Sequence, residues 1–132
     1  MRAFSATAAA RMIEEDITTA RLGELIAAQQ GGKVLLVDFY ADWCQPCKML
    51  SPVLHRLATT PSLLDGREID LVTIDVDKNQ EAAGAFQVRA RRCRTHQIRA
   101  MPTVLAFKDA ELANKFVGVL PESQIKKFIT DA

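Results

Sequence analysis

The chain has few cysteines, almost no net charge and no long hydrophobic run. Its 132 residues include three cysteines, too few for the disulfide framework of a small secreted domain. The net charge of +1 points to no charged partner, and we expect no nucleic acid to bind. No apolar stretch approaches the roughly 20 residues that a membrane span needs, so we expect no membrane association.

What the chain does contain is enough apolar material for one domain with a hydrophobic core. Apolar residues make up 48% of the sequence, which is typical of a globular and not of a disordered protein. A length of 132 residues suits one domain and not two. The sequence shows no tandem repeat of structural units and no glycine-rich loop of the kind that cradles phosphate.

The hydrophobic pattern predicts an α/β fold in which strands and helices alternate before a final hairpin and helix. Strands are expected near 12–17 and at 33–40, 69–76, 103–107 and 112–117, and helices from Thr18 or Thr19 to Gly31-Gly32 and at 45–59, 80–87 and 123–130. Residues 61–66 are expected to form a loop. The alternating half implies parallel strands with right-handed crossovers, to which the hairpin adds antiparallel strands.

Two cysteines at a strand-to-helix junction are the most informative feature of the sequence. Cys44 and Cys47 belong to the segment Trp43-Cys44-Gln45-Pro46-Cys47, between the apolar run 34–40 and the helical pattern 48–54. A dithiol with this spacing can close to a disulfide and reopen. The segment therefore predicts thiol–disulfide exchange in a reducing compartment.

Two alternatives to a redox pair are an inert pair of buried thiols and half of a zinc site. Zinc needs about four ligands, and His55, His96 and Cys93 show no matching spacing. We therefore predict no metal site.

The sequence also assigns roles to three side chains. Cys44 starts the helix, where unpaired N–H groups and the helix dipole favour a thiolate, so its pKa should lie below the usual value of about 8.5 and it should be the attacking sulfur. Cys47 lies one turn further in, should be more buried, and would resolve a mixed disulfide. Asp38 lies inside an apolar strand, where burial would raise its pKa, and is the candidate base for Cys47. The alternative is an Asp38 that points outward or caps a turn.

Further segments in the same order give a family resemblance. They are Val37-Asp38-Phe39-Tyr40-Ala41, Trp43-Cys44-Gln45-Pro46-Cys47-Lys48, Pro52, Asp75-Val76-Asp77, Met101-Pro102-Thr103, Phe107-Lys108 and Val117-Gly118. With these segments the chain resembles thioredoxin over about residues 12–131. The resemblance implies a central mixed sheet flanked by about four helices, and a monomer that reduces protein disulfides. It also implies re-reduction by a thioredoxin reductase that uses FAD and NADPH, the chain itself binding no cofactor beyond its redox-active disulfide.

The resemblance implies further site residues around the two cysteines. Gln45 and Pro46 set the turn between the sulfurs, and Gln45 stands where the family usually has glycine. Trp43 would be a surface aromatic that contacts substrate, the alternative being a core tryptophan. Met101-Pro102 resembles the family's cis-proline loop, where a substrate segment would pair with the backbone. Gly118 would allow a partner to approach closely, or is an ordinary strand-end glycine.

The largest departure from the family pattern is ten extra residues, 91–100, before Met101. Gln87-Val88-Arg89-Ala90 and Gln97-Ile98-Arg99-Ala100 are near copies, so either one could precede Met101. The segment is either a genuine inserted loop or the product of a misplaced exon boundary. Its arginines would form a basic patch that favours acidic partners, and would make Cys93 reactive; the alternative is a solvated loop without a role.

Two smaller departures concern single positions. Thr73 stands where many members have a lysine near the buried aspartate, so the pKa of Asp38 should be higher still. The hairpin segment Lys108-Asp109-Ala110-Glu111 lacks the family's usual glycine, so its turn is of a different type or strained by about 1 kcal/mol.

The first thirteen residues carry Arg2 and Arg11, no acid and many alanines. This composition is typical of a mitochondrial presequence, and Arg2-Ala3-Phe4-Ser5 resembles a matrix-protease cleavage site. We therefore expect residues 1–11 to be a flexible N-terminus or a presequence remnant, residues 12–132 to be the thioredoxin domain, and the location to be the mitochondrial matrix, with the cytoplasm as alternative.

Two other functions are compatible with the sequence. One is a thioredoxin-fold binding or chaperone module whose dithiol is silent because the insertion disorders the Pro102 loop. The other is an oxidase or isomerase, but those relatives often carry a polar residue where this chain has Pro46.

Overall fold

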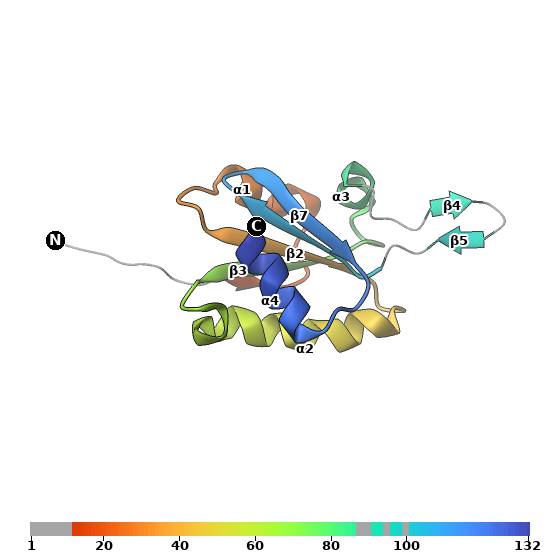
Figure 1. Ribbon diagram of the computed structural model, residues 1–132. Coiled ribbons are helices and arrows are strands. Elements are labelled where there is room, and N and C mark those ends of the chain that lie inside the picture. The colour runs from red at the N-terminus through yellow and green to blue at the C-terminus, as the bar shows by residue number, and fades with distance from the viewer. Residues whose placement is uncertain (1–11, 87–90, 94–95, 99–100) are drawn as a thin grey trace.

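The computed structural model describes residues 12–86, 91–93, 96–98 and 101–132. Figure 1 shows a twisted sheet covered by helices on both faces. In chain order the elements are β1 (Ile13–Glu14), α1 (Thr19–Ala27), β2 (Val34–Tyr40), α2 (Gln45–Thr59), η2 (Pro61–Leu64), β3 (Ile69–Asp75), α3 (Gln80–Ala85), β4 (Arg91–Cys93), β5 (His96–Ile98), β6 (Thr103–Lys108), β7 (Glu111–Val117) and α4 (Glu122–Asp131). No described helix is both long and apolar enough to cross a membrane.

The main sheet has five strands in the order β1-β3-β2-β6-β7. β3 pairs in parallel with β1 and β2, whereas β6 pairs antiparallel with β2 and β7. The predicted mixed sheet is therefore confirmed. β2 is its central strand and is buried from Val34 to Phe39, as its continuous apolar run predicts.

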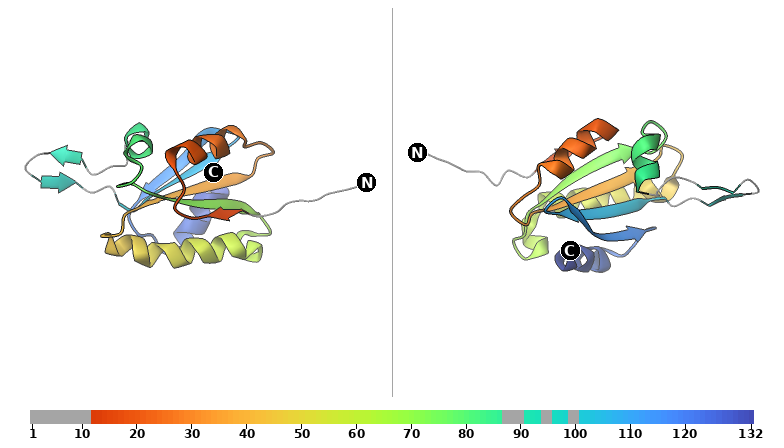
Figure 2. Two further views of the ribbon diagram at one scale, coloured as in Figure 1. Left: turned by 180° about the vertical axis from the view of Figure 1, so that it is seen from behind. Right: turned by 90° about the horizontal axis from the view of Figure 1, so that it is seen from above.

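Each face of the sheet has its own layer of core side chains. α1 and α3 cover one face, where Leu22 and Ala83 pack with alternate residues of β2 such as Val37. α2 and α4 cover the other face, where Leu54 and Ile125 are fully buried. Figure 2 shows the two helical layers on opposite sides of the strands. The four predicted helices are confirmed, and α2 has the predicted bounds.

The structure confirms the predicted start of the first helix and corrects two other local predictions. α1 begins after Thr18, whose side chain accepts a hydrogen bond from the Arg21 N–H, as the capping prediction requires. The helix ends at Ala27 and not at the glycine pair; Gly31 and Gly32 have φ of +81° and +76° and form the turn into β2. The predicted loop after α2 contains the 3₁₀ helix η2, because a proline at its first position favours a tight helical turn.

The insertion contains two short strands that the sequence did not predict. β4 and β5 pair antiparallel with each other and with no described strand of the main sheet. Figure 1 shows this small hairpin beyond α3, outside the five-stranded sheet. The predicted N-terminal segment 1–11 and most of the two near copies lie outside the described residues.

The turn between β6 and β7 has the unusual backbone that its sequence predicts. Lys108 pairs with Glu111, and the two residues between them, Asp109 and Ala110, have φ of 52° and 70°. Two positive φ values are the pattern of a type I′ turn, which favours Asn-Gly or Asp-Gly. Alanine at the second position is therefore strained.

Replacing Ala110 with glycine is expected to raise the free energy of unfolding by about 0.5 to 1 kcal/mol. The relief of left-handed strain outweighs the extra freedom that glycine gives the unfolded chain. Urea denaturation measures the change. Lys115→Gly, in the interior of β7 opposite Leu105, should instead destabilise by about 1 kcal/mol, and a loss of stability in Ala110→Gly would contradict the strain.

Candidate active site

The two cysteines form a disulfide at the start of α2. Cys44 is the N-cap residue, and its Cα lies 5.3 Å from that of Cys47. A turn in which the Cys44 N–H donates to the Ala41 carbonyl, at 3.1 Å, links β2 to the helix. Gln45 and Pro46 are exposed and form the first two helical positions, where proline needs no backbone partner.

The helix start gives Cys44 the electrostatic setting that the sequence predicts. The Cys47 N–H donates to Cys44 Sγ at 3.2 Å. After reduction the same N–H and the helix dipole would stabilise a Cys44 thiolate. The expected difference in burial is very small in this oxidised form, since Cys44 is 4% and Cys47 3% exposed.

Asp38 is buried, as predicted. It is 2% exposed, and its Oδ1 has no hydrogen-bond partner in the described part of the chain. Burial raises its pKa from 3.8 to about 7. The alternative of an outward or turn-capping Asp38 is therefore wrong.

Thr73 lies opposite Asp38 on β3 and supplies no positive charge. Its hydroxyl oxygen accepts a hydrogen bond from the Asp16 N–H at 2.8 Å. Nothing cationic on the facing strand therefore lowers the pKa of Asp38 at this position, in keeping with the predicted effect of losing a lysine here.

A cavity of about 320 Å³ brings Asp38 and Cys47 together between α2 and the β2–β3 part of the sheet. Ser51 and His55 from α2 also line it. The sequence prediction missed this cavity and the place of His55 in it. The signal was present in the four-residue spacing of Cys47, Ser51 and His55, which puts the three on one helical face.

The loop before β6 lies against the disulfide. The Met101–Pro102 peptide bond is cis, as the resemblance implied, and Met101 belongs to the same core cluster as Cys44 and Cys47. The Pro102 carbonyl accepts a hydrogen bond from the Gly118 N–H at 2.8 Å. Gly118 has φ of +96°, and among the described residues no atom beyond its two chain neighbours lies within 4 Å of where a Cβ would be, so the space beside it is open there.

Trp43 is a surface residue, and the alternative of a core tryptophan is wrong. Its side chain is 47% exposed, and its indole N–H donates to Asp77 Oδ2 at 2.8 Å. Met49 on the second turn of α2 is 67% exposed. These two side chains add apolar surface beside the cysteines.

Two further predictions concern a metal site and the reactivity of Cys93. Among the residues that the structure describes, no three His, Cys, Asp or Glu side chains are grouped so as to hold a metal ion. Cys93 lies in β4, where only the backbone is described, so its reactivity stays a prediction.

Comparison with known proteins agrees with the fold. The thioredoxin family profile matches residues 16–131. Thioredoxin of Bacillus subtilis is 36% identical over 103 residues, which cover 78% of this chain and 86% of that protein. Thioredoxin of Fasciola hepatica superposes with a TM-score of 0.69 at 31% identity, over 89% of this chain and 96% of that one.

A second similar structure is the oxidised form of mitochondrial thioredoxin 3 from Saccharomyces cerevisiae. Its TM-score is 0.69 at 29% identity, over 91% of this chain and 95% of that one. With the disulfide-bonded pair Cys44–Cys47, these similarities support thiol–disulfide oxidoreductase function. The chain belongs to the thioredoxin family.

Proposed function

We propose that this chain is a protein-disulfide reductase that works through the Cys44–Cys47 dithiol. The observation that carries the proposal is the meeting of three features at one cavity: the Cys44–Cys47 disulfide, the start of α2 and the Asp38 carboxyl. A closed disulfide at a helix N-terminus lies beside a buried carboxyl whose pKa is raised to about 7. Such a carboxyl exchanges a proton near neutral pH, which the second step of the reaction requires.

In the first step the Cys44 thiolate attacks one sulfur of the substrate disulfide. The substrate S–S bond breaks, and the other substrate sulfur leaves as a thiolate that takes a proton from water. Cys44 is then joined to the substrate in a mixed disulfide. The Cys47 N–H that points at Cys44 Sγ stabilises the attacking thiolate.

In the second step Asp38 takes the proton of the Cys47 thiol. The Cys47 thiolate attacks Cys44 Sγ, the bond from Cys44 to the substrate breaks, and the second substrate sulfur leaves and is protonated. Two electrons have then passed from the dithiol to the substrate, and the chain has the disulfide form described above.

Substrate would bind across Trp43, the Met101-Pro102 loop and Gly118. An extended segment that pairs with the backbone at Met101 would place its disulfide near Cys44, and the open space beside Gly118 allows the approach. We expect thioredoxin reductase, with its FAD and NADPH, to restore the dithiol, this chain acting as a monomer without a bound cofactor. The arginine-containing, acid-free N-terminal sequence supports the mitochondrial matrix as its location.

The alternative of a redox-silent binding module is not favoured. It would require that the insertion disrupt the Pro102 loop, yet the hydrogen bond between Gly118 and Pro102 holds that loop on β7. The redox potential of the cysteine pair would distinguish a reductase from an oxidase or isomerase.

Removal of residues 91–100 is expected to leave reductase activity within about twofold of the full chain. β4 and β5 pair with no described strand of the main sheet, and in the shortened chain Ala90 precedes Met101 as Ala100 does in the full chain. The measurement is dithiothreitol-driven reduction of insulin disulfides by both forms, with Cys44→Ser as the inactive baseline. Inactivity of both forms would refute the proposed function; activity of the shortened form alone would show that the insertion blocks the site.

A further inference from the structure

Two buried side-chain atoms in the described part of the chain lack a hydrogen-bond partner, and both belong to residues that line one cavity. They are Oδ1 of Asp38 and Nε2 of His55. Buried polar atoms in native proteins are nearly always bonded to protein or to ordered water. The cavity of about 320 Å³ has room for several water molecules, each of which occupies about 30 Å³ in the liquid. Water in this cavity would satisfy both atoms.

A row of polar side chains follows the cavity along α2. Cys47, Ser51 and His55 are spaced by four residues and all line the cavity, so the Ser51 hydroxyl lies between the resolving cysteine and the imidazole. At a rise of about 1.5 Å per residue, His55 is about 12 Å along the helix from Cys47. Asp38 and Thr73, neighbours on β2 and β3, form the opposite wall.

His55 lines the same cavity as the buried carboxyl but is more exposed to solvent. Asp38 is 2% exposed, whereas the side chains of His55 and Glu15 are 29% and 65% exposed. His55 Nε2 lies 3.0 Å from Glu15 Oε2, which is ion-pair range but without hydrogen-bond geometry. The polar groups that line the cavity therefore extend from the buried Asp38 to the more exposed His55 and Glu15.

We propose that His55 is a positioning residue that passes protons between Asp38 and solvent through water in this cavity. The inference rests on the proposed function, in which Asp38 receives the proton of Cys47 in every cycle. The proton moves from the Asp38 carboxyl to water, from water to His55 Nε2, and from the imidazole to bulk solvent. The reverse path supplies the proton that Cys47 regains when the disulfide is reduced, and no electrons move in either direction.

Other titratable groups also face this cavity, namely Glu15, Asp16, Tyr40, Asp42 and Lys48. Asp16 is already engaged, since it accepts from the Tyr40 hydroxyl at 3.2 Å and pairs with Lys78 at 3.3 Å. An imidazole can take up a proton on one ring nitrogen and release a proton from the other. His55 is thus suited to pass protons between Asp38 and solvent.

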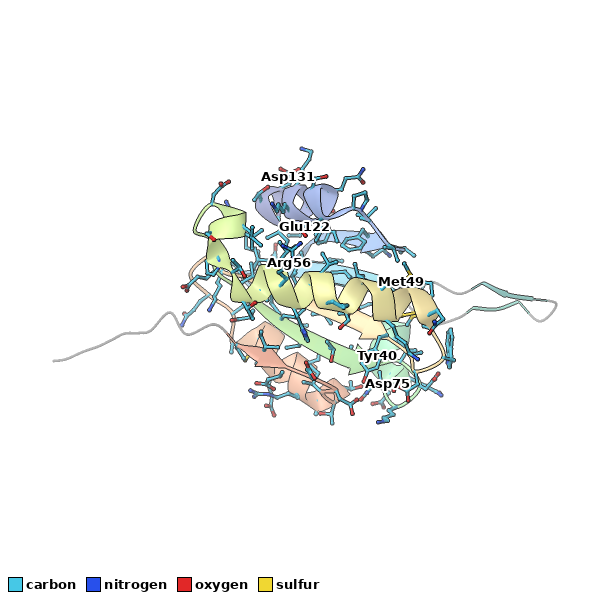
Figure 3. The ribbon with its side chains drawn as sticks, turned by 90° about the horizontal axis from the view of Figure 1, so that it is seen from below. Tyr40, Met49, Arg56, Asp75, Glu122 and Asp131 are labelled. Atoms are coloured by element: carbon cyan, nitrogen blue, oxygen red, sulfur yellow. A yellow bond between two sulfur atoms is a disulfide. The ribbon has the colours of Figure 1, made fainter. Side chains whose placement is uncertain are left out.

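The test is steady-state reduction of a fluorogenic disulfide peptide with excess reductant, between about pH 5.5 and 8.5, in weak and in strong imidazole buffer. His55→Gln is expected to lower kcat about tenfold in weak buffer near neutral pH and to leave KM unchanged. This decrease in kcat is smaller than the decrease expected on loss of a base that takes the proton directly. Strong imidazole should restore the rate of His55→Ala. Arg56→Gln is the matched control, because Arg56 is the next residue but pairs with Glu122 of α4, as Figure 3 shows.

Two further comparisons separate a relay from a structural role. In an Asp38→Asn background, His55→Gln should have no additional effect, because the two residues act in one path. A wild-type rate and pH profile for His55→Gln in weak buffer would overturn the inference while leaving the reductase intact, as would a loss that imidazole does not restore in a folded His55→Ala protein. Inactive wild-type protein would instead refute the proposed function.

Discussion

Replacement of Cys47 with serine is expected to stop the reaction at the mixed disulfide and to lower turnover by more than about a thousandfold. Cys44 can still attack a substrate disulfide, but no sulfur remains to displace the substrate from it. Mass spectrometry of the intact protein, after mixing with a disulfide peptide, should show one added peptide that dithiothreitol removes.

The experiment needs two controls that this chain makes possible. Cys93→Ser should be present throughout, so that an adduct can form only at the paired cysteines. Cys44→Ser in the same background should form little adduct, because the Cys47 thiol lacks the helix-start N–H that points at Cys44 Sγ and would stabilise a thiolate there. Equal adduct formation by the two single mutants would contradict the assignment of Cys44 as the attacking sulfur.

Asp38→Asn is expected to stabilise the oxidised protein by about 3 to 4 kcal/mol at pH 8. Burial raises the pKa of Asp38 from 3.8 to about 7, and a shift of that size is equivalent to about 4 kcal/mol. Below about pH 3.8 the carboxyl is protonated in both the folded and the unfolded state, so no stability is lost by burying a charge. Between about pH 3.8 and 7 the unfolded chain binds fewer protons than the folded one, so the penalty grows until it is complete above pH 7.

The measurement is urea denaturation of both proteins at several pH values, and the gain should shrink toward zero near pH 4. Asp75→Asn is the control, because Asp75 is equally buried but its Oδ1 accepts from the N–H groups of Asp77 and Lys78, at 2.8 and 3.4 Å. It should lose stability and not gain it. A gain in Asp38→Asn that does not change with pH would show that the burial of charge is not its cause.

Much of the fold follows from local pattern in the sequence. The continuous apolar run of β2, the four-residue periodicity of α2 and the alternation of elements each depend on near neighbours, and each is confirmed. The site residues of the 43–47 segment could be placed for the same reason. Asp38 could be placed because a carboxyl is costly to bury inside an apolar strand, so its presence there indicates a role in the site.

The remaining features depend on contacts between distant segments. The cavity forms only where α2 packs on β2 and β3, so His55 could not be linked to Asp38 from the sequence alone. The β4–β5 hairpin was missed because its segment is rich in arginine and lacks the alternation of a buried strand. The early end of α1 was missed because glycine marks both helix ends and ordinary turns.

The reduction potential of the Cys44–Cys47 pair tests the central claim most directly. Equilibration of the full chain with dithiothreitol or glutathione redox buffers, with Cys93→Ser present, gives the fraction oxidised at each ratio. A reductase requires a potential at the reducing end, about −270 mV as for thioredoxin. A potential of about −180 mV or above, in the range of isomerases and oxidases, or a pair that does not equilibrate at all, would contradict the account.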